Sequence, residues 1–238
     1  MEYVLDSHTH TVASGHAYNT VKEMVHAAAE KKLQLLGITE HAEKMPGSCN
    51  NIYFRNLKVL PRRMEGVELL FGVEANIMDF DGGLDVPDDL LSAMDVVIVS
   101  LHPVCLDAGT KEQNTNAYLR TMENPYVNII GHPDDGRYPV DYERLVLAAK
   151  KHHVLLELNN HSLDPGCGRE NARIHDIEML RLCMKYQVPI IMNSDAHWCD
   201  DIADTRFSMP LIKELGFPEE LIVNRSVEAY KAFLTKKL

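Results

Sequence analysis

Residues 96–102 read VVIVSLH, a short run of β-branched and aliphatic residues that ends in a histidine. Short apolar runs of this kind are typical of strands that are buried on both faces of a parallel sheet. Similar runs recur along the chain, and helical patterns separate each from the next. We predict strands at Tyr3–Asp6, Leu35–Thr39, Val67–Val73, Val96–Leu101, Asn128–Ile130, Val154–Leu158 and Pro189–Met192.

This alternation of strands and helices indicates repeated βα units. A chain of 238 residues is long enough for one α/β barrel, and no Pro-, Gly- or Ser-rich linker divides it. We therefore expect residues 1–238 to form a single domain of the α/β class.

Three helices are marked by their ends or their apolar stripe. Thr20 and Glu23 form a capping-box pattern that leads into a helix at Met24–Lys32. Asp141 is placed to cap a helix at Tyr142–Lys151. The last segment, Ser226–Leu238, carries an apolar stripe at helical spacing and is predicted to be an outer helix.

Side chains that commonly bind metal ions stand where the predicted strands end. They are His8, His10, His16, His41, Glu74, His102, His132, Asp195 and His197. A single histidine of this kind is more often hydrogen-bonded than bound to a metal. Their recurrence at successive strand ends is different, because the carboxyl ends of barrel strands meet at one mouth. The pattern predicts a polynuclear metal site that performs hydrolysis.

The spacing of two ligand pairs supports this prediction. His8 and His10 are two residues apart at the end of a strand, so they point to the same face and can hold one ion. Asp195 and His197 repeat the spacing after the last strand. Nitrogen-rich ligation favours zinc, with manganese or iron next, over magnesium or calcium.

The composition limits the partners. The formal net charge of −11 argues against a face that binds long nucleic acid or an anionic membrane, although bound cations can still attract a phosphate. The five cysteines form no Cys-x-x-Cys pair, which favours a reducing, cytoplasmic compartment. No apolar run approaches the length of a membrane span, and the oligomeric state is open.

The predicted ligands stand in six short motifs, DSHTHT (6–11), ITEH (38–41), GVEAN (72–76), HP (102–103), GHP (131–133) and NSDAH (193–197). Taken in order, these motifs resemble those of the polymerase and histidinol phosphatase (PHP) superfamily along essentially the whole chain. VASGHAY (12–18) is also similar to the small stand-alone bacterial phosphatases of that family. The resemblance implies a distorted (β/α)7 TIM-like barrel with three metal ions. It also implies a small phosphorylated substrate.

The resemblance also divides the ligands among the ions. One ion would be bound by His8, His10, Glu74 and Asp195, and Glu74 would bridge to a second ion on His102 and His132. A third would be bound by His16, His41 and His197. One residue departs from the family, which usually has Asp where this chain has Glu40, and we leave the role of Glu40 open.

We expect a phosphatase that hydrolyses a small phosphomonoester by metal-activated water, with Glu74, Asp195 and His197 as its catalytic residues. Arg137, Asn159 and Arg169 are candidates for contacts to the substrate, although each could equally be a solvated loop residue. His161 is expected to be a loop residue and not a further ligand. The loops at residues 42–53, 76–87 and 160–169 follow strands and are expected to shape the substrate site.

Three other functions use the same features. A phosphodiesterase or exonuclease acting on nucleotides or short oligonucleotides would need the same metals. A metal-dependent amidohydrolase also uses paired histidines on its first strand, but this chain has no lysine at the end of a middle strand to carry a bridging carbamate. A metal-binding module without turnover is the remaining alternative.

Overall fold

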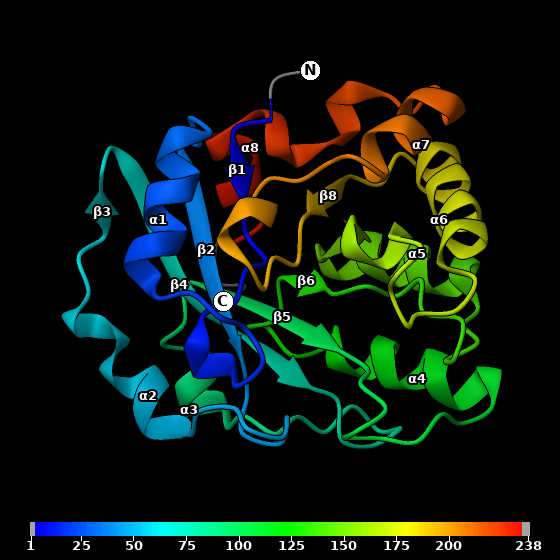
Figure 1. Cartoon of the computed structure of the whole chain (residues 1–238). Helices are drawn as coiled ribbons and strands as arrows, with labels where there is room; N and C mark the ends of the chain where they lie inside the picture. The colour runs from blue at the N-terminus through cyan, green and yellow to red at the C-terminus, as the bar shows by residue number, and fades with distance from the viewer. Residues whose placement is uncertain (1–2, 235–238) are drawn as a thin grey trace.

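The computed structural model describes residues 3–234 and is built on one curved sheet with helices outside it (Figure 1). Its parallel strands follow in the order β1 (Leu5–Asp6), β2 (Leu35–His41), β4 (Val67–Asn76), β5 (Val96–Ser100), β6 (Ile129–Ile130), β7 (Leu155–Asn159) and β8 (Ile190–Asn193). Each overlaps one predicted strand. The predicted distorted, TIM-like α/β barrel is thus confirmed.

Four strands run farther than predicted, β7 and β8 by one residue each and β2 and β4 by more, and the extra residues of β2 and β4 belong to the candidate site. β2 continues to His41 and β4 to Asn76, and the register pairs His41 with Glu74. A short strand that was not predicted, β3 (Arg63–Met64), pairs antiparallel with β4. Glu65 and Gly66 connect them with positive φ angles of 49° and 86°, which suit a tight hairpin turn.

The helices are α1 (Val21–Glu30), α2 (Asn51–Asn56), α3 (Asp88–Leu91), α4 (Lys111–Thr121), α5 (Tyr142–His152), α6 (Ala172–Tyr186), α7 (Ser208–Leu215) and α8 (Val227–Lys231). Short 3-10 turns lie at η1 (Val12–Ser14), η2 (Leu57–Val59), η3 (His161–Leu163), η4 (Cys199–Asp201), η5 (Glu219–Leu221) and η6 (Val223–Arg225). Among residues 3–234, no helix is long and apolar enough to cross a membrane.

The predicted helix ends are largely confirmed. Thr20 forms the expected capping box with Glu23, so α1 begins at Val21, three residues earlier than predicted. The Asp141 side chain accepts a hydrogen bond from the Arg144 N–H at 3.1 Å, which caps α5. The last helix is shorter than predicted and ends at Lys231, and the predicted residues 235–238 lie outside the described part of the chain.

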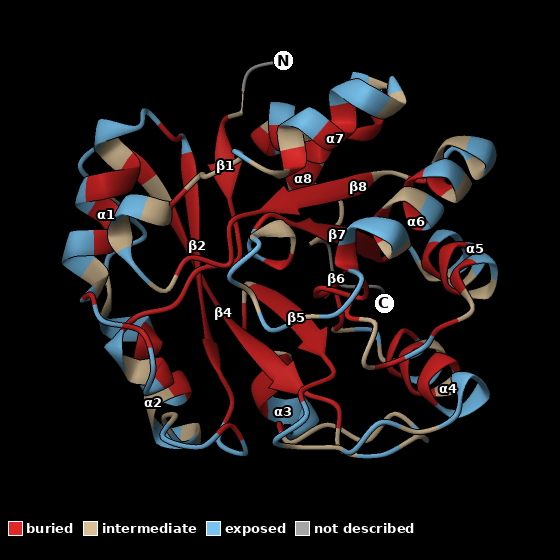
Figure 2. Ribbon diagram, turned by 45° about the vertical axis from the view of Figure 1, so that its right-hand side comes forward, coloured by how far each residue is buried: buried red, intermediate tan, exposed pale blue. Residues whose placement is uncertain are grey.

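The strands of the parallel sheet are almost entirely buried (Figure 2). Apolar side chains form two clusters, one on each face of this sheet. Leu36 and Ile38 of β2 belong to the cluster between sheet and helices. Leu35, Ile98 and Ile191 belong to the second cluster, inside the barrel. Because apolar side chains close the barrel interior, the polar site occupies the mouth at the carboxyl ends of the strands.

The barrel is closed between β1 and β8 mainly by side chains. The described backbone has one isolated bridge there, Thr9 with Ala196. Deeper in the barrel, the Asn224 amide donates to Leu5 O at 3.1 Å and Met192 O at 2.6 Å, and its oxygen accepts from Met192 N at 2.7 Å. These bonds satisfy buried backbone groups where the two strands lack a ladder. The amide of Asn224 thus replaces part of a strand pairing.

Candidate metal centre

Glu74 lies at the centre of the predicted ligand cluster. Its Oε1 is 3.3 Å from His102 Nε2 and 2.9 Å from His132 Nε2. Its Oε2 is 3.3 Å from His8 Nε2 and 2.7 Å from His41 Nδ1. One carboxylate therefore faces side chains that come from the ends of four other strands, which is the geometry required of a bridging ligand.

The remaining ligands surround this centre. Asp195 Oδ1 is 3.6 Å from His8 Nε2 and 3.3 Å from His10 Nε2. The His16 ring stacks on the rings of His41 and His197, with centroid distances of 4.9 and 4.8 Å. The structure thus brings all nine predicted residues together.

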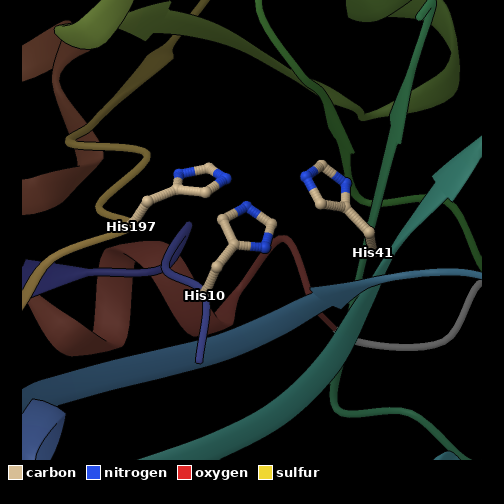
Figure 3. A group of neighbouring side chains, drawn as sticks. All are labelled: His10, His41 and His197. Atoms are coloured by element: carbon tan, nitrogen blue, oxygen red, sulfur yellow. The ribbon is translucent and has the colours of Figure 1, made fainter. Parts of the chain in front are cut away.

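Within the described residues, three groups of side chains place their ligand atoms within 4.8 Å of one another. They are His8, His10 and Glu74; His41, Glu74 and His102; and His10, His41 and His197. Figure 3 shows the last group, in which three rings from separate segments converge. That these residues bind ions stays a prediction.

Several buried nitrogen and oxygen atoms of the cluster lack a hydrogen-bond partner within the described part of the chain, which is expected of atoms that bind a metal ion. Among residues 3–234, His8 Nε2, His10 Nε2, His41 Nδ1 and Glu74 Oε2 are buried without a hydrogen-bond partner. Burying such atoms unpaired is costly, and metal ions bind imidazole nitrogens and carboxylates of this kind. The donor set matches zinc, manganese or iron.

Protonation fits the ligand roles of His10 and His16, whereas at His8 burial lowers the pKa but the carboxylates of Glu157, Asp195 and Glu74 outweigh burial and raise it. Burial and the neighbouring His41 and His197 lower the pKa of His10, and the same three causes lower the pKa of His16 to about 4. Burial raises the pKa of Glu74, but His41 and His8 outweigh it and hold that pKa well below its usual range. Neutral imidazoles beside an ionised carboxylate are the forms that bind cations.

The outer nitrogens of three ligands are held by other side chains. His8 Nδ1 is 2.7 Å from Glu157 Oε1, His102 Nδ1 is 2.8 Å from Asn76 Oδ1, and His10 Nδ1 is 3.0 Å from Ser14 Oγ. Such bonds orient the rings so that Nε2 faces the cluster. The sequence interpretation missed Glu157, although a single carboxylate inside the apolar strand β7 is a detectable signal.

Glu40 acts on the cluster through Ser14. Its carboxylate accepts hydrogen bonds from Thr11 N at 3.0 Å, Ser14 Oγ at 2.6 Å and Tyr53 Oη at 3.3 Å. The Ser14 hydroxyl also contacts His10 Nδ1 and accepts from His41 N at 3.0 Å. The residue whose role the sequence left open therefore positions the serine between two predicted ligands.

Arg169 lies beside the cluster with its side chain largely buried. Its Nη2 donates to Asp195 Oδ2 at 2.9 Å, and its Nη1 donates to Asn159 Oδ1 at 3.1 Å and Ser162 Oγ at 2.9 Å. These three bonds use three of the five guanidinium N–H groups. Ser162 in turn donates to Asp134 Oδ1 at 3.1 Å. The guanidinium is therefore held in one position, and, among the contacts of residues 3–234, two of its N–H groups remain available for a ligand.

A family model for the PHP domain matches residues 6–179 of this chain. The chain belongs to the PHP domain family. It is 46% identical over 230 residues to a protein named "Probable phosphatase" from Caldicellulosiruptor bescii, covering 97% of this chain and 95% of that one. It is 44% identical over 237 residues to a "Probable phosphatase" from Clostridium botulinum strain Langeland, covering 100% and 96%.

Solved structures agree on the fold. Histidinol phosphate phosphatase from Lactococcus lactis, solved with zinc, L-histidinol and phosphate, superposes with a TM-score of 0.65 at 20% identity, covering 91% of this chain and 95% of that one. A histidinol phosphatase from Listeria monocytogenes gives a TM-score of 0.61 at 19% identity, covering 86% and 99%. At this identity the likeness concerns the fold.

A cavity of about 490 Å³ opens beside the cluster of this PHP domain. Its lining residues on the side of the cluster, which we call its inner end, are His16, His41, His102, Asp195, His197 and Arg169. Of the three loops expected to shape it, residues 42–53 contribute Met45, and residues 160–169 contribute four side chains including Arg169. None of its lining residues comes from 76–87. The loop after β8 forms that part of the wall instead, and it supplies Trp198, Asp201, Asp204, Arg206 and Phe207.

Two predicted substrate contacts of this PHP domain are placed differently from expectation. Asn159 does not line the cavity, because its amide nitrogen donates to Glu157 and Asp195 and its oxygen accepts from Arg169 and Ser162. Arg137 also lies off the cavity, with its Nε and Nη2 both bound to Asp135 at 2.9 and 2.6 Å. Only Arg169 of the three lines the cavity.

Proposed function

We propose that this protein is a metal-dependent phosphatase that hydrolyses a small phosphomonoester at a site for three divalent ions. The observation that carries the proposal is Glu74, whose two oxygens face four histidines from four other strands. The names of the curated relatives support the phosphatase activity. The zinc, L-histidinol and phosphate in the Lactococcus structure support the metal and the substrate class.

The ligand sets of this proposal are those that the family resemblance implies. One ion would be held by His8, His10, Glu74 and Asp195, a second by Glu74, His102 and His132, and a third by His16, His41 and His197. Zinc is the first choice, with manganese or iron as alternatives. When bound, these ions supply an activated water and neutralise charge on the phosphoryl oxygens.

The protein's own residues orient the reaction. Arg169 is proposed to donate its remaining N–H groups to a phosphoryl oxygen, while its bond to Asp195 keeps it next to the ligands. Glu74, Asp195 and His197 contribute by holding the reacting centre. In the overall step water adds to phosphorus, the ester P–O bond breaks, and the leaving alcohol takes a proton.

The proposal also includes the compartment in which the protein works and the size of its substrate. The five cysteines are unpaired, which supports our proposal that it works in a reducing cytoplasm. A cavity of about 490 Å³ suits a small molecule and not long nucleic acid.

Two measurements test the function. Elemental analysis of the purified protein should find zinc, manganese or iron bound. Release of inorganic phosphate should then be measured from L-histidinol phosphate, sugar phosphates and nucleoside monophosphates with each metal added. Phosphodiesters, short oligonucleotides and cyclic amides serve as comparisons. A well-metallated protein that cleaves one of these and no monoester contradicts the proposal, and a metallated protein inert on all substrates favours a binding module.

A further inference from the structure

The outer end of the cavity differs chemically from the end that holds the cluster. It is lined by aromatic residues, Tyr18, Trp198 and Phe207, and by charged ones, Asp164, Asp201, Asp204 and Arg206. None of these belongs to the predicted ligand set. A phosphoryl group held at the inner end would direct its leaving group toward this outer wall.

Two of the aromatic side chains are unusually open to solvent. Tyr18 is 73% exposed and Trp198, the single tryptophan of the chain, is 47% exposed. The Tyr18 N–H donates to His197 O at 3.2 Å, so both side chains leave the backbone directly beside a predicted ligand. Large rings that stay exposed next to a reaction site offer flat apolar surface on which a ligand ring can stack.

The charges of the outer wall are mostly negative. Arg206 is already paired, with its Nε 2.8 Å from Asp204 Oδ2 and its Nη2 3.7 Å from Asp201 Oδ1. With Asp164, the wall carries three carboxylates against one guanidinium. A second phosphate or a carboxylate on the leaving group would meet repulsion here, whereas a neutral or positive group would not.

We propose that the site selects phosphomonoesters whose leaving group is a flat ring without a second anionic group. This inference rests on the proposed function. Trp198 and Tyr18 stack on the ring, and Asp201 with Asp164 disfavour anionic substituents. In this proposal the residues of the inner end carry out the hydrolysis, and those of the outer end select the leaving-group alcohol of the substrate.

A matched series of synthetic substrates tests ring recognition. Benzyl phosphate and cyclohexylmethyl phosphate have alcohols of similar size, but only the first is flat. We expect kcat/KM to be about tenfold higher for benzyl phosphate, mainly through KM, as stacking of this kind predicts. Trp198→Ala should remove this preference, because it should lower kcat/KM far more for benzyl phosphate than for cyclohexylmethyl phosphate. Ile174→Ala, an exposed position on α6 that does not line the cavity, is the control.

Charge recognition is tested with 4-carboxybenzyl and 4-(aminomethyl)benzyl phosphate. The wild type should disfavour the carboxylate by about tenfold or more relative to the amine, and Asp201→Asn should narrow this ratio. Equal kcat/KM across the series, or an equal effect of Trp198→Ala on flat and puckered substrates, would overturn the inference.

Binding measurements separate this inference from the proposed function. Benzylphosphonate and cyclohexylmethylphosphonate cannot be hydrolysed, and calorimetry with the metallated protein compares their affinities directly. Tighter binding of benzylphosphonate that is lost in Trp198→Ala supports the selection even if no ester is turned over. Equal binding of the two phosphonates by a protein that does hydrolyse monoesters refutes the selection and leaves the phosphatase proposal standing.

Discussion

The inner and outer ends of the cavity are built by different parts of the fold. Most cluster side chains leave strands or the residues just after them, and His8, His10 and Glu74 are completely buried, whereas His16 lies in the loop after β1 and is exposed. The outer wall consists of loop side chains after β1, β7 and β8, several of them exposed. Rigid strand ends can hold a cluster to within tenths of an ångström, whereas surface loops tolerate substitution. Reaction and specificity are therefore separable by mutation.

Glu74→Gln should have the largest effect. It removes the negative charge between two proposed ions, so we expect metal content to fall and kcat/KM to drop by more than about a thousandfold on every substrate. Elemental analysis and phosphate release measure both. Glu68→Gln lies on the same strand, where Glu68 pairs with Lys231 at the surface, and should retain metal and activity. Full activity in Glu74→Gln would refute the cluster assignment.

Glu157→Gln should weaken the site without abolishing it. Glu157 holds the outer nitrogen of His8, and loss of such a partner costs about 10- to 100-fold in metal affinity. Titration of the chelated protein with zinc measures this affinity. Glu123→Gln, at a surface pair with Arg120, is the matched control. Unchanged affinity would mean that His8 needs no support.

Ser162→Ala tests whether Arg169 needs its fixed position. We expect kcat/KM to fall by about tenfold with metal content unchanged, because Arg169 loses one hydrogen bond that orients it. In an Arg169→Ala background the same substitution should cost almost nothing, since it acts through the guanidinium. Independent, additive losses in the double variant would rule out positioning.

The depressed pKa of His16 predicts a pH effect on the metal-free protein. The unfolded histidine takes up a proton below pH 6.5, whereas the pKa of about 4 keeps folded His16 neutral to lower pH. Between these values the unfolded chain binds more protons, so this group lowers stability as pH falls. Urea unfolding of the chelated protein at pH 7 and pH 5 should show a smaller loss for His16→Gln than for wild type. An equal loss contradicts the assignment.

The smallest effect is expected at Cys167, which lies outside the cluster in the loop after β7. Burial raises the pKa of its thiol, but a hydrogen bond from His161, a backbone hydrogen bond from Arg169 and the charges of both residues together outweigh burial and lower this pKa. Burial raises the pKa of Cys183 to about 12. Iodoacetamide followed by peptide mass spectrometry should therefore modify Cys167 well before Cys183, with metal content unchanged. Preferential labelling of Cys183 would contradict this local electrostatic picture.

The positions of the strands and the residues that gather in the cluster were predictable because both leave local patterns. An apolar run that ends in a ligand-type residue, as at His102, predicts both the strand and the side chain that its carboxyl end brings to the mouth of the barrel. The strand ends were less accurate, since β2 and β4 continue through His41 and Glu74 only because each has a partner across the sheet.

The unpredicted features depend on contacts between distant residues. Glu157 meets His8 across 149 positions. The exception is Arg137, whose guanidinium is bound by Asp135, only two positions away in the sequence. The cavity wall was also misassigned in part, because which loops fold over the mouth depends on their packing. Local patterns predict which side chains stand at each strand end, but not which loops fold over the mouth of the barrel.

The hydrogen bonds of Asn224 bear on the order in which the parts of the barrel fold. It ties Leu5 to Met192, segments from opposite ends of the chain, so its bonds form only after nearly every intervening unit is in place. Such long-range closure is entropically late in folding. Because His8 and His10 sit on one side of this closure and Asp195 and His197 on the other, the full ligand set exists only in the closed ring. Binding of the proposed ions during refolding would therefore report the last step of assembly.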